Sequence, residues 1–540
     1  MNLLTEPWMP VRKRDGSRQW IAPTRLSDPD IVAFDANRAD FNGALAQFAI
    51  GLLQTTTPVD SPIEWRRLFK APPDAAALES WFTPVISAFE LDGDGARFMQ
   101  DLSLSGTGGD VWGIDALMME APGKNGLEKN TDHFIKRAGI LSICPHCVAA
   151  ALFTLQTNAP AGGAGHRTGL RGGGPLTTLL LNPTGACLWQ DVWLNIQEHQ
   201  LFLDSCCDKE KQALHFSFPW LADISAIQKE GGETAPVQVH PAHVFWAMPR
   251  RIRLDFAKVF AGNCDICGRE SARLISEYVT GTHGLNYKGA WDHPLSPYYE
   301  AKDGWLPLHP QPGGIGYRYW LAWVIGNNDG KKHERRAHVV EHFLTRRTHQ
   351  VPGALRLWAF GYDMDKGKAR CWYEATLPLY SLGDCEPGAQ KDVEAEVGNW
   401  LAAADLAVNF LRVAVKDAWF SRDARGDLSV VDAAFWNGTE SQFYVQLKRK
   451  IESIRDHFDP DSGAVREEWL KCIVGAALRL FDDDFAGAGQ AERQNPRRMA
   501  AAFQQLKRSL YGSKMRQAIG LPRISDTHSK RDTHKRAAAV

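Results

Sequence analysis

The sequence predicts an α+β protein, in which a large mixed α/β N-terminal domain is followed by an all-α C-terminal four-helix bundle. The first part of the chain mixes short β-like runs with helical stretches, whereas the apolar residues beyond it recur with the spacing of amphipathic helices. The breaker-rich stretch LGDCEPG at Leu382–Gly388 separates the two parts and suits a linker. A chain of 540 residues is also too long for one core. We therefore assign residues 1–385 to the N-terminal domain, 386–515 to the bundle and 516–540 to a flexible basic tail.

The N-terminal domain takes its elements from short local patterns. The β-like runs are Thr177–Leu181, Leu355–Phe360 and Ala369–Tyr373, and the stretches with helical apolar spacing are Ala44–Leu53 and Cys147–Leu155. Between the last two β-like runs, Asp365-Lys366-Gly367 is a plausible tight turn, which predicts a hairpin with Lys366 and Lys368 at its tip. No period of about 20–50 residues recurs, which argues against a solenoid or a propeller.

Four amphipathic helices make up the predicted bundle. The first covers residues 392–420, where six apolar residues share one face: Trp400, Ala404, Ala407, Phe410, Leu411 and Val415. Thr439-Glu-Ser-Gln442 has the form of a capping box and opens the second helix. The third runs from about Val465 to Phe481, and Asn495-Pro496 supplies a good N-cap and first-turn pair for the fourth. Four such helices with moderate connections favour an antiparallel bundle.

Charge and hydropathy limit the classes of protein to which this chain can belong. Lysine and arginine number 62 against 63 aspartates and glutamates, which gives a net charge of −1. The chain is therefore no globally basic protein, and it would bind nucleic acid through local patches or as part of a larger basic assembly. The N-terminus lacks the apolar stretch of a signal peptide, and no apolar run approaches the length of a membrane span. We expect a cytoplasmic protein whose thiols stay reduced.

Four of the ten cysteines form two CxxC pairs: Cys144 with Cys147, and Cys264 with Cys267. Such a turn lets two thiolates converge on one tetrahedral metal, and the glycine after the second pair, Gly268, relieves the tight knuckle. The two pairs, separated by residues 148–263, predict a structural Zn²⁺ that pins distant segments of one domain. His146 could replace one thiolate as a ligand. A redox role is the alternative, although neither pair follows a clear βα start of thioredoxin type.

The segment Ala161–Gly174 reads AGGAGHRTGLRGGG and contains seven glycines in fourteen residues. Backbone so rich in glycine is costly to order, and it suits places where backbone must approach a partner closely. Arg167 and Arg171 beside exposed N–H groups suggest that this partner carries phosphates. The segment matches neither a nucleotide-triphosphate cradle nor a dinucleotide fingerprint. A flexible surface loop is the alternative interpretation.

A second basic segment, Lys124–Arg137, reads KNGLEKNTDHFIKR and carries one aromatic residue, Phe134. Cations that follow phosphates and a ring that stacks on a base suit single-stranded nucleic acid, although one phenylalanine can equally be a hydrophobic anchor. The sequence contains no GxSxG, HExxH or HD motif, and the CxxC turns lack the HxE partner of a nucleobase deaminase. These absences favour a binding subunit over an enzyme.

These segments, together with NLLTEPWMPVRKRDG at the N-terminus and WDHPLSP at Trp291–Pro297, resemble those of the CasA family. CasA proteins are the large subunits of the type I-E CRISPR Cascade surveillance complex. The resemblance covers nearly the whole chain and implies a zinc-containing α/β domain, a C-terminal four-helix bundle and no catalytic activity. It also implies recognition of the protospacer-adjacent motif in duplex DNA through the minor groove, initiation of strand separation and recruitment of a helicase-nuclease. The partners are then crRNA, target double-stranded DNA and the other Cascade subunits.

The resemblance carries over to three sets of residues. The set implied to contact crRNA is Lys129, Asn130 and Phe134. The glycine loop implied to face the minor groove is Ala161, Gly162, Gly163, Ala164 and Gly165. The wedge implied to enter between the strands is Asp365, Lys366, Gly367 and Lys368. Some relatives have a glutamine at the wedge position of Lys366, so motif preference is not carried over. The alternatives to this function are a zinc-stabilised nuclease and a pure assembly scaffold.

Overall fold

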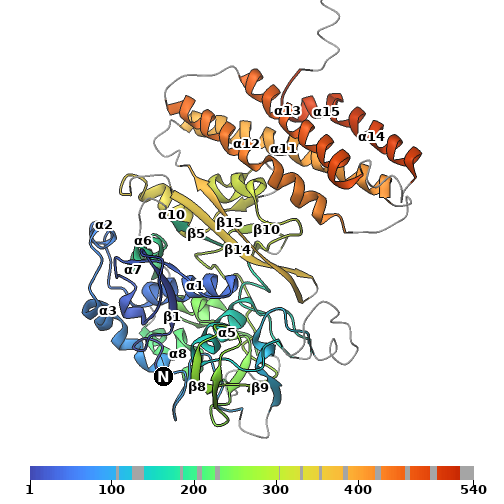
Figure 1. Ribbon diagram of the computed structural model, residues 1–540. Helices are drawn as coiled ribbons and strands as arrows, with labels where there is room; N and C mark the ends of the chain where they lie inside the picture. The colour runs from blue at the N-terminus through green and yellow to red at the C-terminus, as the bar shows by residue number, and fades with distance from the viewer. Residues whose placement is uncertain are drawn as a thin grey trace, which may run out of the picture. The chain divides into compact units, whose positions relative to one another are not determined.

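The computed structural model describes residues 1–104, 109–123, 139–163, 165–182, 187–203, 209–224, 232–302, 304–328, 333–351, 355–365, 367–380, 387–419, 427–455, 462–486 and 495–522. The chain divides into two compact units. The first comprises Met1–Gln311 and Asn328–Leu379, and the second comprises Pro312–Asn327 and Tyr380–Val540. The predicted α+β class with a helical C-terminal region is confirmed (Figure 1). The predicted boundary at residue 385 lies outside the described residues and stays a prediction.

The first unit holds several small antiparallel sheets. One sheet has the strand order β2 (Arg18–Ile21), β1 (Met9–Lys13), β3 (Ile31–Phe34), and a second has the order β4 (Asp110–Gly113), β9 (Glu277–Gly281), β6 (Arg251–Leu254). Strands β7 (Phe260–Asn263) and β8 (Glu270–Leu274) pair with each other, and β10 (Tyr298–Ala301) lies between β11 (Gly304–Pro307) and β13 (His333–Arg335). The last sheet has the order β15 (Lys368–Leu379), β14 (Leu355–Asp365), β5 (Thr177–Leu181). The last of these sheets contains all three predicted β-like runs.

The helices of the first unit are α1 (Ala39–Thr56), α2 (Pro62–Lys70), α3 (Ala75–Phe82), α5 (Pro145–Asn158), α6 (Leu188–Trp193), α7 (His199–Leu203), α8 (Leu214–Ser217) and α10 (His338–Arg346). Both predicted helical stretches of the domain are confirmed by α1 and α5, which pack against each other. Helix α1 is apolar almost all round and is buried along most of its length, as expected of a helix in the middle of a core.

The core of the first unit is built around one aromatic ring of α1, that of Phe48. Five further rings meet Phe48 edge-on at centroid distances of 5.1–5.9 Å: Trp8, Phe89, Phe98, Phe153 and Trp246. Edge-to-face contacts of this kind add to the stabilisation that comes from burying apolar area. Several of the 19 tryptophans therefore serve the core, and five of the first unit are fully buried: Trp8, Trp65, Trp189, Trp193 and Trp246.

The predicted hairpin is formed by β14 and β15, the two long strands labelled in Figure 1. Their register pairs Asp365 with Lys368, so the turn contains two residues between them, Lys366 and Gly367. Gly367 has φ +86°, a backbone conformation that two-residue hairpin turns require and that glycine adopts without strain. Lys366 itself lies outside the described residues.

The second unit contains α11 (Pro387–Trp419), α12 (Ser429–Arg455), α13 (Ser462–Arg479), α14 (Pro496–Leu510) and α15 (Ser513–Ala518). Helix α11 packs against each of the other four. The start of the fourth predicted helix is confirmed, because the Asn495 side chain accepts hydrogen bonds from the backbone N–H groups of Arg497 and Arg498. Residues 516–522 continue this unit: Ile519 is buried and Arg516 pairs with Glu467 at 2.7 Å. The rest of the predicted tail, 523–540, lies outside the described residues.

The predicted capping box at Thr439 is wrong. Helix α12 begins ten residues earlier, at Ser429, so Thr439 lies in the interior of the helix. Its hydroxyl donates to the carbonyl of Phe435, one turn back, and lies 2.8 Å from the hydroxyl of Tyr317. A serine or threonine can satisfy its hydroxyl inside a helix in this way, and a capping-box pattern alone does not distinguish the two positions.

In the part of the chain that the structure describes, no helix is long and apolar enough to cross a membrane.

A buried ion cluster beneath α10 gives the first unit a predictable dependence on pH. The Glu198 carboxylate lies 2.5 Å from the Arg347 guanidinium and 3.1 Å from the His342 ring. The Arg347 guanidinium also stacks over the ring of Trp65 at 3.9 Å. Burial opposes ionisation of Glu198, but the hydrogen bond with His342 and the charge of Arg347 together lower the pKa of Glu198 to about 2.

We expect this cluster to contribute stability that is lost in acid. The folded pKa of Glu198 lies below the ordinary value of about 4.3, so its contribution is present above that pH and is lost as the pH falls towards 2. The contribution is on the order of 3 kcal/mol. Urea unfolding at pH 5 and pH 3 should therefore show a smaller acid loss for Glu198→Gln than for the wild type. Glu64→Gln is the control, because that side chain is 39% exposed and its pair with Arg67 is loose, at 3.7 Å. An equal acid loss in all three proteins would contradict the assignment.

Candidate functional site

The four cysteines of the CxxC pairs come together in the first unit. Their sulfur atoms all lie within 4.8 Å of one another, and Cys144 Sγ is 3.7 Å from Cys267 Sγ. A tetrahedral site with Zn–S bonds of about 2.3 Å has sulfur atoms about 3.8 Å apart, so this donor set fits a zinc ion. The cluster is mostly buried, since three of the four thiols are buried and only Cys267 is half-buried. Four cysteines placed in this way could hold a metal ion.

Local structure explains how two distant segments reach this point. The first pair opens helix α5, where Cys144 is the N-cap residue and Pro145 occupies the first turn. The second pair occupies the turn between β7 and β8, in which Gly268 has φ +71° and its N–H donates to the carbonyl of Cys264. The Asp265 carboxylate then accepts hydrogen bonds from the backbone N–H groups of residues 141 and 142, at 2.8 and 2.7 Å. These bonds tie the second turn to the chain just before the first.

The thiols of the cluster lie within hydrogen-bonding distance of one another. Hydrogen bonding from Cys144 lowers the pKa of Cys264 and lowers the pKa of Cys267 to about 7, whereas hydrogen bonding within the cluster raises the pKa of Cys147. A bound zinc ion would displace the thiol protons and would hold all four sulfurs as thiolates. His146 lies at the edge of the cluster, with Nδ1 3.9 Å from Cys144 Sγ and 3.5 Å from Arg269 Nη1.

The glycine loop lies between the end of α5 and β5, on the surface of the first unit. Ala161, Gly162 and Gly163 are exposed, and Gly163 and Gly165 have φ values of +68° and +85°. The N–H of His166 donates to the carbonyl of Gly163 at 2.8 Å, which closes the loop on itself. Ala164 lies outside the described residues. The loop therefore presents nearly bare backbone.

The glycine loop and the hairpin turn lie beside each other. A Cβ atom built on Gly367 would stand 2.5 Å from the carbonyl oxygen of Ala161, so there is no room for a side chain between them. Farther along the glycine-rich segment, Gly174 lies equally close to the Tyr362 side chain of β14. Two regions that are about 200 residues apart in the sequence are thus joined in one surface feature, which we call the loop–hairpin site: residues 161–165 and 365–368.

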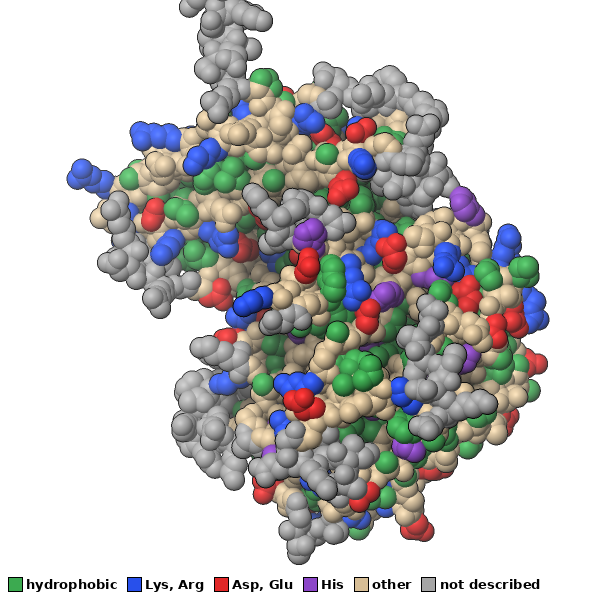
Figure 2. Space-filling model, turned by 180° about the vertical axis from the view of Figure 1, so that it is seen from behind, with side chains coloured by type: hydrophobic (Ala, Val, Ile, Leu, Met, Phe, Trp, Pro, Cys, Tyr) green, Lys and Arg blue, Asp and Glu red, His purple; other side chains and the backbone are tan. Residues whose placement is uncertain are grey.

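The charge of the hairpin is largely balanced. Arg370 donates to the Asp363 carboxylate at 2.6 Å across the hairpin, whereas Lys368 is exposed near the turn. On the face of the molecule seen in Figure 2, basic and acidic side chains are interspersed, in keeping with the net charge of −1. Attraction of a polyanion to the loop–hairpin site would therefore come from a few local cations rather than from an overall field.

The hairpin is anchored to helix α1 near its turn, by the buried hydroxyl of Tyr362. Tyr362 donates from its hydroxyl to Asp40 Oδ2 at 2.5 Å, and Asp40 pairs with Arg38 at 2.9 Å. Arg38 also pairs with Glu120 at 2.7 Å. Burial raises the pKa of Tyr362, so the hydroxyl stays protonated and remains a donor at neutral pH.

We expect Tyr362→Phe to destabilise the first unit. The substitution keeps the ring but removes one of the two side-chain hydrogen bonds that Asp40 Oδ2 accepts, the other coming from Arg38 Nη2. A hydrogen bond to a charged group contributes about 1.5–3 kcal/mol. Urea unfolding followed by tryptophan fluorescence measures this change. Tyr299→Phe is the matched control, because that side chain is 37% exposed. Equal stability of the two variants would contradict the anchoring role.

Two further residues surround the loop, of which sequence reasoning missed Arg250 and reached His283 only as the end of the stretch Thr280–His283, which matches the position of a motif-contacting lysine in some relatives. Arg250 lies against Gly162, where a Cβ atom would stand 2.6 Å from its Nη1. His283 has φ +61°, and its backbone N–H donates to the carbonyl of Gly165 at 2.9 Å. Neither residue belongs to a recognisable motif, and both reach the loop only through the fold of the sheet that contains β6 and β9.

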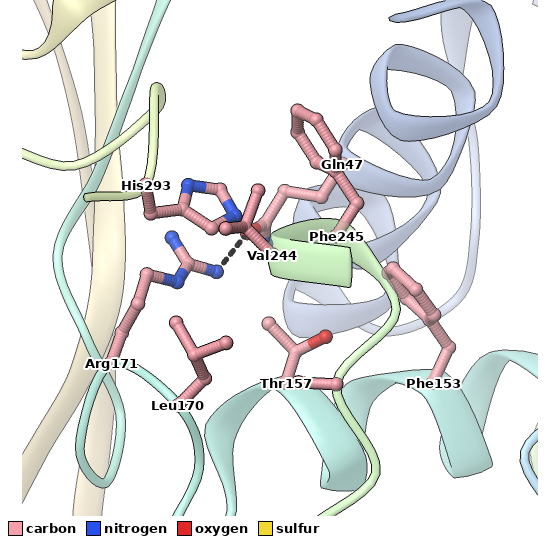
Figure 3. A pocket seen from close by; sticks show the side chains of 9 residues that line it. Gln47, Phe153, Thr157, Leu170, Arg171, Val244, Phe245 and His293 are labelled. Carbon is pink, nitrogen blue, oxygen red and sulfur yellow. Dashed lines mark hydrogen bonds between the residues drawn. The ribbon is translucent and has the colours of Figure 1, made fainter. Parts of the chain in front are cut away.

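The expectation that Arg171 faces phosphates is wrong. Figure 3 shows its side chain directed into the protein towards Gln47. The guanidinium donates to Gln47 Oε1, Thr177 Oγ1 and Ser296 Oγ, and burial lowers the pKa of Arg171 to about 10. Arg171 therefore joins the glycine-rich segment to α1 and β5 from the inside. Residues Lys129, Asn130 and Phe134, with an expected role in crRNA contact, lie outside the described residues.

Comparisons with known proteins agree with this architecture. CasA of Thermus thermophilus is 16% identical, with a TM-score of 0.65 over 94% of this chain and 99% of that chain. Cse1 from Acidimicrobium ferrooxidans is 18% identical, with a TM-score of 0.63 over 96% and 99%. A chain of a CRISPR RNA-guided surveillance complex is 15% identical, with a TM-score of 0.61 over 95% and 99%.

At sequence identities as low as these, the structural matches show only that the folds are alike. Membership of a protein family is shown by the match between the sequence and the model of that family. The model of the CRISPR-associated protein Cse1 matches residues 2–480, which is most of the chain. The chain therefore belongs to the CRISPR-associated Cse1 family, the CasA proteins of type I-E Cascade.

Proposed function

We propose that this chain is the large subunit of an RNA-guided Cascade complex and that it recognises the protospacer-adjacent motif in duplex DNA. The observation that carries the proposal is the contact between the exposed glycine loop and the hairpin turn, where Gly367 leaves no room for a side chain beside the Ala161 carbonyl. Family membership and the similarity to a chain of a surveillance complex support the same role.

The glycine loop is suited to the minor groove. That groove is narrow, so backbone without side chains can approach its floor more closely than any larger residue. It also distinguishes base pairs poorly, since it offers a nearly degenerate pattern of acceptors. A reader that uses the backbone of residues 161–165 should therefore tolerate several related motifs.

The hairpin is suited to start strand separation. Its tip is a two-residue turn with exposed Lys368 beside it, narrow enough to enter between the strands at the edge of the motif. It needs to hold open only the first one or two base pairs, because pairing of the guide RNA with the target strand nearly offsets the free energy of opening the rest of the duplex. We assign this wedge role to Asp365, Lys366, Gly367 and Lys368.

The remaining parts of the proposal concern partners and the metal. Lys129, Asn130 and Phe134 are assigned to crRNA, and other Cascade subunits hold the guide, in keeping with the net charge of −1. A helicase-nuclease is recruited to the assembled complex for degradation, so the chain itself carries no catalytic step. Cys144, Cys147, Cys264 and Cys267 hold a structural Zn²⁺ that fixes the start of α5, the helix that leads into the glycine loop.

The test is reconstitution of a crRNA-bound complex with and without this chain. Target duplexes that differ only in the base pairs beside the protospacer are compared for affinity and for strand opening. We expect both to depend on the flank only when the chain is present.

We also expect the double variant Lys366→Ala, Lys368→Ala to weaken target binding while the complex still assembles. The matched control is Lys448→Ala, Lys450→Ala on helix α12. Equal binding to every flank would overturn the proposal and favour an assembly scaffold.

A further inference from the structure

Arg250 lies directly beneath the glycine loop and is hydrogen-bonded to the segment that leads into it. Its backbone N–H donates to Gln156 Oε1, and its carbonyl accepts from Gln156 Nε2, both at 2.9 Å. Gln156 belongs to α5, the helix that precedes the loop. The Arg250 side chain donates through Nη2 to the carbonyl of Pro160, at the point where the chain leaves this helix. The guanidinium thus fixes the path of the backbone into the loop.

The side chain also explains why residue 162 is a glycine. A Cβ atom on Gly162 would stand 2.6 Å from Arg250 Nη1 and 2.6 Å from the Cβ of His166. With the guanidinium in this position, a side chain at residue 162 would collide with it and with the Cβ of His166. The positive charge is therefore held immediately behind exposed backbone, on the opposite side from a molecule that docks on the loop.

This charge is not balanced by a carboxylate. Arg250 is 8% exposed, and among the described residues no acidic side chain lies within ion-pair distance of its guanidinium. Its Nε has no hydrogen-bond partner in the same part of the chain. Burial lowers the pKa of Arg250 to about 10, a value that still leaves the group charged at neutral pH.

The neighbouring arginine provides a direct comparison. Arg251 pairs with the Asp101 carboxylate at 2.5 Å, as is usual for a partly buried guanidinium. Burying a charge without a counter-charge is costly. Arg171 is also buried without an acidic partner among the described residues, but its guanidinium donates to three side-chain oxygens in the core. Arg250 differs because its Nε has no partner in the described chain and its guanidinium lies against exposed backbone. A polyanion that docks on the loop would supply the missing counter-charge.

We propose that Arg250 is the positioning residue of the glycine loop, and that its uncompensated charge draws a phosphodiester of the duplex onto the loop. The inference rests on the proposed function, because it assumes that duplex DNA docks at residues 161–165. The guanidinium does not read a base. It fixes the position of the loop backbone relative to the rest of the domain. It also adds one fixed positive charge beneath the loop, which strengthens the attraction between the loop and the phosphates nearest the groove.

Two substitutions separate the geometric contribution from the charge. Arg250→Met removes both, whereas Arg250→Lys keeps the charge and loses the forked donor geometry. Each variant is assembled into the crRNA-bound complex and titrated, over a series of salt concentrations, with a pool of target duplexes whose flanking base pairs are randomised. The dependence of affinity on salt measures the contribution of the Arg250 charge. The range of affinities among duplexes with different flanking base pairs measures how precisely the loop is positioned. Arg97→Met is the control, because Arg97 also donates to a loop carbonyl, that of Gly93.

We expect Arg250→Met to reduce the slope of log affinity against log salt by up to about 1, the value for loss of one cation that contacts a phosphate, and to lower affinity for the preferred flanks about tenfold. Arg250→Lys should keep the slope and reduce only the spread among flanks. If both variants keep the wild-type salt slope and the wild-type spread of affinities among flanks, the inference is overturned. If Arg250→Met fails to assemble, Arg250→Lys decides alone: a reduced spread supports the inference, and an unchanged spread overturns it.

The same experiment separates this inference from the proposed function. A wild-type complex that binds all flanks equally would overturn both. A wild-type complex that discriminates among flanks, with Arg250 variants that discriminate equally well, would overturn only the role of Arg250.

Discussion

Exchanging Cys264 for serine should release about one zinc ion per chain and lower the stability of the first unit by more than about 3 kcal/mol. Cys264 is 2% exposed, and its Sγ accepts a hydrogen bond from the Cys144 backbone N–H at 3.3 Å. A serine at this position binds zinc far more weakly than a thiolate does, so the metal would lose one of four ligands. Because a site of this kind is absent from the unfolded chain, the free energy of metal binding is also free energy of folding.

The check combines metal analysis of the purified chain with thermal unfolding in the presence and absence of a chelator. Cys187→Ser is the matched control, because Cys187 is a buried thiol of the same unit outside the cluster. It occupies the N-cap position of α6, where serine is well tolerated. We expect this control to keep its metal. Full stability of a zinc-free wild-type chain, or equal destabilisation by the two substitutions, would rule out a structural metal.

The cysteine cluster could be predicted from sequence because its signal is local. Each CxxC turn brings two thiols together by itself, and Gly268 marks the knuckle of the second turn. The remaining step, the meeting of the two turns, needs only the assumption that isolated pairs of this kind complete each other. The hairpin was predictable for a similar reason, since Asp365-Lys366-Gly367 lies between two runs with strand spacing.

Features that depend on the tertiary environment could not be read in this way. Arg167 and Arg171 belong to the same glycine-rich segment, yet only the fold reveals that Arg171 enters the core and donates to Gln47. The start of α12 was misplaced because Thr439 satisfies its hydroxyl within the helix, against the Phe435 carbonyl. Arg250 could not be found at all, because nothing in the sequence around it differs from an ordinary strand beginning.

Gly367→Val should disrupt the loop–hairpin site more than any other single change in the hairpin. Gly367 has φ +86°, a conformation that costs about 1–2 kcal/mol for a residue with a Cβ atom. Its Cβ would also stand 2.5 Å from the Ala161 carbonyl oxygen, so the turn and the glycine loop must move apart. Flank-dependent strand opening, followed by a fluorescent base analogue in the first protospacer pair, should fall at least about tenfold, equivalent to about 1.4 kcal/mol of binding free energy.

A second hairpin glycine separates the contact from the backbone strain. Gly16, in the turn between β1 and β2, has φ +84°, and a Cβ atom built there would meet nothing within 4 Å. Gly16→Val thus carries the same conformational cost without the collision, and it should lower stability by about 1–2 kcal/mol while strand opening stays at the wild-type level. If the two variants impair strand opening equally, general destabilisation explains the loss. If only Gly367→Val impairs it, the close approach of the hairpin turn to Ala161 is what the opening of the duplex requires.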